Sequence, residues 1–258
     1  MLKILFIGDV VGRPGRRVLR RLMPELKERY RADLVIANAE NSAGGIGATP
    51  STVGELHELG VDIITMGNHV WRHSELVARL DELPYTLRPA NYPPGTPGHG
   101  AIATNTQDGT PVAVLNLQGR VFMEPIDCPF RTAQRLVPEL KEQARIIIVD
   151  FHAEATSEKV AMGWFLDGKV TAVIGTHTHV ATADERILHH GTAYITDVGM
   201  TGPHDSVIGV KKEIAIRRFV QGIPIHFQVA KGEERLEAVL IECDPATGRA
   251  SAIHRLRH

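Results

Sequence analysis

Five apolar segments of the chain each end in side chains that can bind a metal ion. These segments are short and are followed by polar or Gly-rich residues, which is typical of strands buried on both faces. The carboxyl ends of parallel strands share one edge of a sheet, so residues distant in the sequence are expected to meet there. In chain order the segments end at Asp9, at Glu40 and Asn41, at Asn68 and His69, at His152, and at His177 and His179.

The types of these side chains narrow the metal. They offer oxygen and nitrogen donors and no sulfur, which favours Mn, Fe, Zn or Co. Three histidines disfavour an all-oxygen Mg or Ca site. The set is too large for one tetrahedral ion and suits two ions about 3.5–4 Å apart that share a bridging carboxylate. The candidate ligands are Asp9, Glu40, Asn41, Asn68, His152, His177 and His179.

The charge of such a site indicates its substrate. Two carboxylates, Asp9 and Glu40, do not neutralise two divalent ions, so the site stays positive and favours an anion such as a phosphate ester. His177 and His179 are two residues apart, and if both lie on a strand they share one face and reach one site. A single strand-terminal Asp is more often a turn residue or a helix cap, but chance explains the whole set poorly.

The elements that must position these residues alternate between strands and helices, which predicts an α/β fold with a largely parallel sheet. Helices are expected over Pro14–Tyr30, where Pro24 would kink or split the helix, and over Pro50–Leu59, Ser74–Leu80, Thr132–Gln143 and Ser157–Leu166. Strands are expected at Leu2–Gly8, Asp33–Ala39, Val61–Met66, Pro111–Leu117, Arg145–Asp150 and Val170–Gly175.

The C-terminal part of the chain has a different pattern, with strand-like segments, short turns and little helix. We expect these strands to be antiparallel and to form a second sheet or extend the first. They are Thr192–Thr196, Glu213–Val220, Pro224–Ala230 and Leu236–Cys243.

Composition sets the broad class. The chain has 258 residues, 29 Lys+Arg and 30 Asp+Glu, so its formal net charge is −1, and 43% of its residues are hydrophobic. This is ordinary globular composition, and near-zero charge argues against a protein that mainly coats nucleic acid or an anionic membrane. Cys128 and Cys243 form no metal-binding pair, and no segment is long and apolar enough to span a membrane. We therefore expect a cytoplasmic protein without a stable nucleic-acid complex; a homo-oligomer stays open.

The motifs, read in order, resemble the calcineurin-like metallophosphoesterase superfamily. The matches are G-D at Gly8–Asp9, G-N-H at Gly67–His69, the lone His152, and G-T-H-T-H at Gly175–His179. Two features depart from that pattern: Val11 stands where the superfamily has a histidine, and N-A-E-N replaces the central G-D. With G-D-V-V-G-R-P-G, D-F-H-A-E and D-V-G-M-T-G-P, the altered pattern resembles the YmdB-type phosphodiesterases.

The resemblance implies a fold, a ligand set and an activity. The fold would be one domain over residues 1–258, with two packed sheets flanked by helices in a four-layer sandwich. Glu40 would bridge two ions, Fe or Mn in the first place with Zn as a further option, and a bridging hydroxide would attack phosphorus. His69 would assist the leaving group, and the substrates would be 2′,3′-cyclic nucleotides. One ion would be held by Asp9, Glu40, Asn41 and His179, and the other by Glu40, Asn68, His152 and His177.

Other functions stay open. The same site suits a phosphomonoesterase acting on a nucleotide or phosphoprotein, although no arginine clamp for a terminal phosphate is evident. A regulatory protein that keeps the metal for structure is a non-enzymatic alternative. A dinucleotide-binding oxidoreductase is disfavoured, because the glycines at 8, 12 and 15 do not have the G-x-G-x-x-G spacing. Glu154 either orients a ligand or is an exposed loop residue.

Overall fold

Two six-stranded sheets form the centre of the molecule in a computed structural model that describes residues 1–258. In the first sheet β1, β3, β4 and β5 are parallel, and β14 and β15 are antiparallel additions at one edge. Its order is β15 (Ala250–Arg257), β14 (Glu237–Cys243), β1 (Leu2–Ile7), β3 (Leu34–Asn38), β4 (Ile63–Thr65) and β5 (Thr86–Leu87).

The second sheet faces the first. Its four central strands are parallel, and each edge carries one short antiparallel strand. Its order is β10 (Arg186–Ile187), β11 (Ala193–Ile195), β9 (Ala172–Thr176), β8 (Ile146–His152), β7 (Pro111–Gln118) and β6 (Ala101–Asn105).

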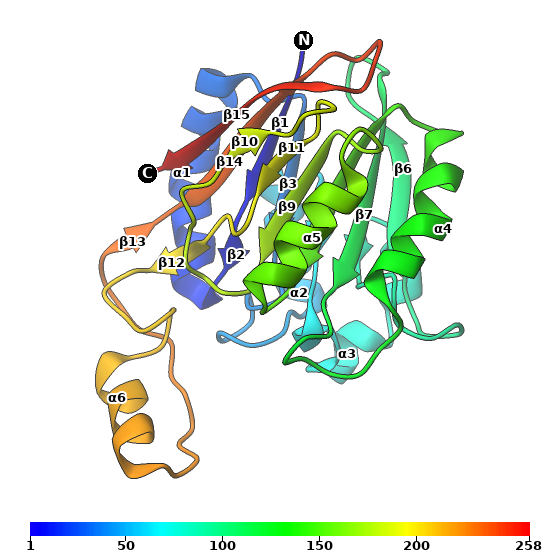
Figure 1. Ribbon diagram of the computed structural model, residues 1–258. Coiled ribbons are helices and arrows are strands. Elements are labelled where there is room, and N and C mark those ends of the chain that lie inside the picture. Colours follow the sequence, from blue (N-terminus) through cyan, green and yellow to red (C-terminus); the bar gives the residue numbers. More distant parts are fainter.

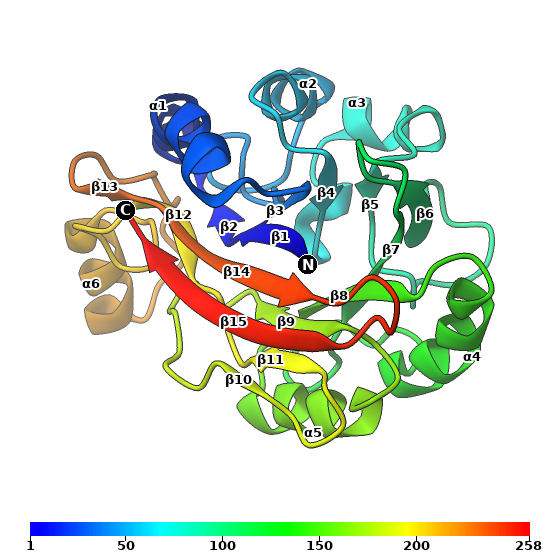
Figure 2. The same cartoon turned by 90° about the horizontal axis from the view of Figure 1, so that it is seen from above.

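Helices cover the outer faces of both sheets, so that α1, α2 and α3 lie on one side and α4 and α5 on the other (Figure 2). One face of each sheet contributes to the apolar layer between the sheets, which includes Phe6 and Ile148. The opposite faces pack on the helices. The fold is thus the predicted four-layer sandwich. The helices are α1 (Gly12–Tyr30), α2 (Pro50–Glu58), α3 (Ser74–Val77), α4 (Pro129–Lys141), α5 (Thr156–Leu166) and α6 (Lys212–Gln221), with short 3-10 turns η1 (Asn68–Trp71) and η2 (Leu80–Glu82).

Helix α1 is one continuous element, so Pro24 does not split it. Its buried residues, including Val18, Leu19 and Leu26, pack on the first sheet, and this burial outweighs the missing hydrogen bond of Pro24. None of the helices is both long enough and apolar enough to cross a membrane.

A third, small sheet lies next to the site and pairs strands from the two ends of the sequence. It consists of β13 (Glu234–Arg235), β12 (Met200–Pro203) and β2 (Asp9–Val10). Met200 of β12 pairs with Asp9 of β2 in parallel register, which fixes the backbone of Asp9 against a strand that is distant in the sequence.

The C-terminal part corrects three predictions. The segment Glu213–Val220 is not a strand but lies in α6, which protrudes from the body of the molecule (Figure 1). The segment Pro224–Ala230 is not a strand either; only Val229 makes a single bridge, to Val210. The Ile, Phe and Val residues of this segment favour a strand only where a sheet covers one face, and here only Ala215 is buried.

The third correction concerns strand direction. β11, expected to be antiparallel, runs parallel to β9 and antiparallel only to the two-residue β10. β14 is antiparallel as predicted, and it pairs with β15, a strand that was not predicted.

Candidate metal centre

The predicted ligands converge at the carboxyl ends of both sheets. Asp9 is the first residue of β2, which directly follows β1. Glu40 and Asn41 lie in the turn after β3, and Asn68 and His69 open η1 after β4. From the second sheet, His152 is the last residue of β8, and His177 and His179 follow β9. Within each sheet the strands are parallel, so their carboxyl ends share one edge, and the packing of the two sheets brings the two edges together.

Glu40 lies at the centre of the cluster and is almost fully buried. Its Oε2 is 3.2 Å from His152 Nε2, and its Oε1 is 3.0 Å from His69 Nδ1. Nδ1 of His177 lies 3.0 Å from His152 Nε2, and atoms of Glu40, His152 and His177 all lie within 4.8 Å of one another. This compact triad of carboxylate and imidazole groups is suited to a divalent transition metal.

Two oxygens of the cluster have no hydrogen-bond partner. Asp9 Oδ1 and Asn68 Oδ1 are both buried and unpaired. A buried oxygen without a partner is costly, and few occur in native proteins. A bound cation would satisfy both atoms, so the donor set fits metal ions.

Gly67 makes room for this cluster. A Cβ at this position would overlap the ring of His152 and the carboxylate of Glu40. The glycine of the G-N-H motif is therefore required by close approach of the ligands, since its φ of −131° is open to any residue.

The ionisation of the Glu40 and Asp9 carboxylates favours the binding of cations in the cluster. Burial raises the pKa of the Glu40 carboxyl, but the His152 and His69 imidazoles outweigh burial and hold that pKa well below its usual value. Burial likewise opposes ionisation of Asp9, yet His179 lowers its pKa overall. Both carboxylates thus stay ionised and draw positive charge into the site.

The imidazoles respond to these carboxylates in different ways. Burial lowers the pKa of His179, but the Asp9 carboxylate, whose Oδ1 lies 3.6 Å from His179 Nε2, reverses this and raises the pKa to about 9. Burial also lowers the pKa of His177, and the nearby His152 adds to the effect, so the pKa of His177 falls to about 3. Protons on some of these imidazoles hold the positive charge that metal ions would supply.

Thr176 and Asp150 orient the ring of His152 through its Nδ1 atom. The Thr176 hydroxyl donates to Asp150 Oδ1 at 2.7 Å and lies 2.9 Å from His152 Nδ1. Since the hydroxyl proton goes to Asp150, the Thr176 oxygen accepts from Nδ1–H of His152. The neutral imidazole then keeps its lone pair on Nε2, the atom that faces Glu40 and His177.

The turn that carries His177 and His179 corrects one prediction. These residues follow β9 rather than lie on a strand, so they do not share a strand face. Both have left-handed backbone conformations, with φ of +101° and +64°. Such φ values are uncommon for non-glycine residues and must be imposed by surrounding contacts.

Those contacts come from a buried ion pair. Asp197 Oδ2 accepts hydrogen bonds from the backbone and hydroxyl of Thr178, at 3.1 and 2.8 Å, and pairs with Lys159 Nζ at 2.6 Å. On the other side of the turn, His177 N–H donates to Asp9 Oδ2 at 3.2 Å. The turn is thus held between Asp197 and Asp9.

The remaining ring atoms of the two histidines also have partners. His179 Nδ1 lies 2.9 Å from the carbonyl of Ile208, so Nδ1 donates and Nε2 faces Asn41 and Asp9. His177 Nε2 lies 3.1 Å from Glu154 Oε2. Glu154, left open between two interpretations, is half-exposed and contacts a predicted ligand.

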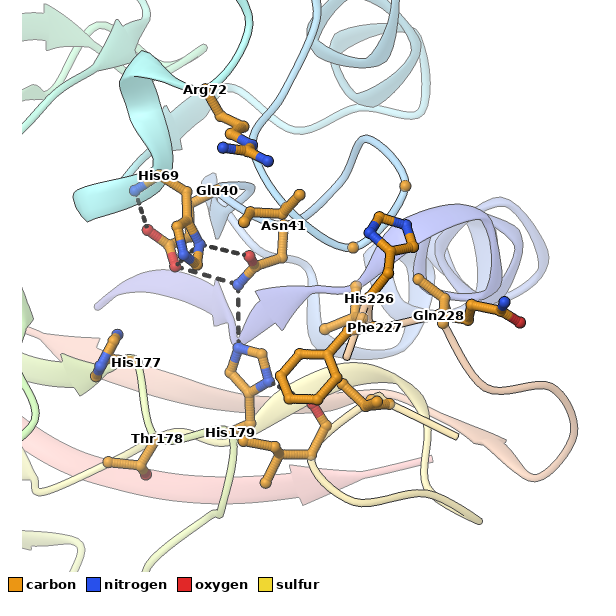
Figure 3. Close-up of a pocket in the computed structure, with 18 of the residues that line it drawn as sticks. Glu40, Asn41, His69, Arg72, His177, Thr178, His179, His226, Phe227 and Gln228 are labelled. Carbon is orange, nitrogen blue, oxygen red and sulfur yellow. Dashed lines mark hydrogen bonds and ion pairs between the residues drawn. The ribbon is translucent and has the colours of Figure 1, made fainter. Parts of the chain in front are cut away.

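Asn41 and His69 lie side by side in the site (Figure 3). Asn41 Nδ2 is 3.1 Å from His179 Nε2, and Asn41 Oδ1 is 2.8 Å from His69 Nδ1. Ligation through Oδ1 on the His179 side requires the amide to turn by 180°, a change that exchanges O and N. His69 is partly exposed and lines the cavity, whereas its Nδ1 points at Glu40 and Asn41.

A cavity of about 590 Å³ opens over these ligands. Much of its wall was not predicted: Arg72 follows His69, and Ile208–Val210 and Ile225–Val229 come from both sides of α6. His226, which belongs to none of the sequence motifs, is part of this wall. No local motif marks Ile208–Val210 or Ile225–Val229, because they reach the site only through the excursion of the chain around α6.

Comparison with known proteins shows the family of the chain. The family model described as "YmdB-like protein" matches residues 5–256. The "2′,3′-cyclic-nucleotide 2′-phosphodiesterase" of Bacillus subtilis (strain 168) is 49% identical over 255 residues, which cover 99% of this chain and 96% of that protein.

Two solved structures have the same fold along the whole chain. A protein from Thermus thermophilus is 44% identical, with a TM-score of 0.93 and coverage of 100% of this chain and 99% of that one. A structure described as a novel phosphatase from Mycoplasma pneumoniae is 39% identical, with a TM-score of 0.94 and coverage of 100% and 93%. The chain belongs to the YmdB-like family, a group of metallophosphoesterase type with the calcineurin-like fold.

Proposed function

We propose that this chain is a dinuclear-metal phosphodiesterase that hydrolyses 2′,3′-cyclic nucleotides, with residues 1–258 acting as one domain. The observation that carries the proposal is the Glu40–His152–His177 triad, whose ligand atoms lie within 4.8 Å of one another, together with the buried, unpaired Oδ1 of Asp9. The Bacillus subtilis relative is named for the same reaction and is similar over nearly its full length.

The ligand residues divide between two ions, with Glu40 shared. Asp9, Asn41 and His179 would complete one set, and Asn68, His152 and His177 the other. The mixed oxygen and nitrogen donors favour Fe or Mn, with Zn as a further option. Bound ions would supply Lewis-acid charge at the phosphate and lower the pKa of a water nucleophile.

The protein's own residues then set the geometry of the reaction. Thr176 and Asp150 hold the neutral tautomer of His152 with Nε2 facing the site, and Ile208 does the same for His179 through its carbonyl. The cavity above them admits a small phosphodiester. No basic groove for a polynucleotide is needed for such a substrate.

His69 is the proposed acid. Its Nδ1 lies 3.0 Å from Glu40 Oε1, on the side of the proposed ligands, and the ring lines the cavity, so Nε2 is left to face a substrate. The proton on Nε2 is then free to pass to the leaving oxygen. Water adds to phosphorus, the bond from phosphorus to O2′ breaks, and O2′ takes the proton, so the product is a nucleoside 3′-phosphate.

The test is incubation of manganese-loaded or iron-loaded protein with 2′,3′-cyclic AMP, followed by chromatography of the two monophosphate isomers. We expect adenosine 3′-phosphate, complete loss of turnover with a chelator, and a loss of about 10²- to 10⁴-fold in His69→Ala, the usual contribution of general acid catalysis. His254→Ala, a change at an exposed residue on β15, is the matched control. Metal-loaded protein without turnover contradicts the proposal.

A phosphomonoesterase is the second candidate. The sequence indicates no arginine clamp, but Arg72 and Arg218 both line the cavity and offer charge for a terminal phosphate dianion. Adenosine 3′-phosphate and adenosine 2′-phosphate are the comparison substrates. Faster release of inorganic phosphate from either one than opening of the cyclic diester would favour this candidate.

A further inference from the structure

One wall of the cavity, beside His179, is largely apolar and comes from one excursion of the chain. We call residues 208–230 the α6 arm. The arm leaves the body at Ile208, forms α6, turns at Gly222, whose φ is +66°, and returns through Ile225–Val229 (Figure 1). Only the base of the arm lines the cavity, together with Arg218 from α6.

The base of the arm is fixed on the site by backbone contacts. Lys211 N–H donates to the Gln228 carbonyl at 3.0 Å, and Ala230 N–H donates to the Gly209 carbonyl at 2.8 Å. The Val229 side chain lies so close to Gly12 and Gly45 that a Cβ at either glycine would press on it, at 3.2 and 2.5 Å. The returning segment therefore has a set position over the loop that follows Glu40 and Asn41.

One contact ties the arm to a proposed metal ligand. The carbonyl of Ile208 accepts from His179 Nδ1 at 2.9 Å. The side chains that follow at the base of the arm are thus held close to the metal centre, within reach of a substrate whose phosphate lies on the ions.

Phe227 is the one aromatic ring of the cavity wall outside the imidazoles. Its side chain is 42% exposed, and the guanidinium of Arg218 lies 4.6 Å from the ring centroid. The ring is flanked by His226 and Gln228, which offer hydrogen-bonding groups, and Arg72 stands near His69 on another part of the wall (Figure 3). An exposed ring with a cation against it is a surface on which a flat, electron-rich group stacks.

We propose that Phe227 is the stacking surface for the nucleobase of the substrate, and that it gives the enzyme its preference for nucleotides over other cyclic phosphodiesters. The inference rests on the proposed function, since the phosphate of the same substrate would lie at the metal centre. His226 and Gln228 then face the edge of the base. An aromatic surface tolerates any base, so the preference is for a base as such rather than for adenine.

Phe219 is a matched control on the same arm. It is 80% exposed and does not line the cavity. Loss of its ring removes a similar exposed apolar group without touching the proposed surface.

The experiment compares two substrates, 2′,3′-cyclic AMP and ribose 2′,3′-cyclic phosphate, which lacks the base. Phe227→Ala is expected to raise KM for cyclic AMP by roughly 5- to 150-fold, the range for loss of one base–aromatic stack, and to leave the baseless substrate unchanged. Phe227→Trp keeps the activity on cyclic AMP. Phe227→Leu separates stacking from filling of space, since leucine retains apolar bulk but no ring. Phe219→Ala changes neither substrate.

Equal losses on both substrates in Phe227→Ala, or full rescue by Phe227→Leu, would overturn the inference and give Phe227 a purely structural role. Unchanged kinetics on cyclic AMP would overturn it as well. If the wild-type protein turns over neither substrate, the proposed function fails, and calorimetric binding of adenosine 3′-phosphate and ribose 3-phosphate to the manganese-loaded protein decides the base-binding role. Weaker binding of the adenosine compound alone in Phe227→Ala supports that role, and any other pattern contradicts it.

Discussion

The carboxylate of Asp197 holds Thr178 at two points, accepting from its backbone N–H at 3.1 Å and from its hydroxyl at 2.8 Å. Thr178 lies between His177 and His179, and both histidines have left-handed φ values. A conformation that costs of order 1–3 kcal/mol per residue persists only under such constraint. The buried pair of Asp197 with Lys159 therefore serves the metal centre although neither residue is a proposed ligand.

Variants of Asp197 and Lys159 can separate the effect of this pair on stability from its effect on metal binding. Asp197→Ala leaves the Lys159 charge buried and unpaired, so we expect a loss of about 3–5 kcal/mol in the free energy of unfolding, measured by urea denaturation. Lys159→Met in the same chain removes the unpaired charge and should restore most of the stability. Metal affinity, measured by calorimetry, should stay low in the double variant because Thr178 is still unheld. Recovery of both properties together would show that Asp197 does not position the turn.

The Thr176 hydroxyl should matter for metal affinity through His152. Thr176→Val keeps the shape of the side chain but removes the acceptor for Nδ1–H, so the tautomer with Nε2 free loses its support. Loss of such a supporting contact typically weakens metal binding by about 10- to 100-fold. Thr86→Val is the control, because the buried hydroxyl of Thr86 has no partner. Equal affinities in the two variants would count against this role.

Metal affinity should rise with pH between about 6 and 9. Asp9 overcomes the effect of burial and raises the pKa of His179 to about 9, so this imidazole is protonated below that pH when no metal is bound. A ligand must be neutral, so binding releases the proton and affinity grows about tenfold per pH unit for each proton released. Calorimetry in two buffers of different ionisation enthalpy counts the protons. A count of zero at pH 7 would rule out His179 as a ligand that must deprotonate.

Gly67→Ala should disrupt the metal centre although the substitution changes no charge. The added methyl group overlaps His152 and Glu40, and displacement of a catalytic group by about 1 Å can cost roughly 100-fold in rate. Gly54→Ala is the matched control, since a Cβ there meets nothing within 4 Å and the residue lies inside α2. That control should stabilise the protein by about 0.5–1 kcal/mol. Activity and unfolding curves of both variants test the contrast.

The two cysteines should differ in reactivity. Burial raises the pKa of the Cys243 thiol to about 12, and Cys243 lies in the layer between the sheets, whereas Cys128 is partly exposed at the start of α4. Since the thiolate is the reactive form, iodoacetamide at pH 8 should label Cys128 in the native protein and both cysteines after denaturation. Mass spectrometry of the labelled peptides gives the result; native labelling of Cys243 would mean that the sheet edge opens.

The sequence by itself determined which residues meet. Asp9, Glu40, Asn68 and His152 each stand at the end of an apolar, β-rich segment. Parallel strands connected by helices bring the carboxyl ends within one sheet to one edge, while the packing of the two sheets brings His152 to Asp9, Glu40 and Asn68. For that reason an α/β fold with ligands at the strand ends was predictable from local patterns, whereas the four-layer arrangement was implied only by the resemblance to a known family.

Only the tertiary structure decided the rest, because it depends on contacts between residues far apart in the chain. The left-handed turn of His177 and His179 is imposed by Asp197 and Asp9, and no local pattern encodes it. The segment Glu213–Val220 contains Ile, Phe and Val, which favour strands, but it has no sheet to pair with and lies in α6 instead. Phe227 reaches the cavity only because Val229 seats the returning chain against Gly12 and Gly45. Parallel pairing places the carboxyl ends of all strands in a sheet at one edge. Each of these outcomes instead depends on particular contacts between residues that are distant in the sequence.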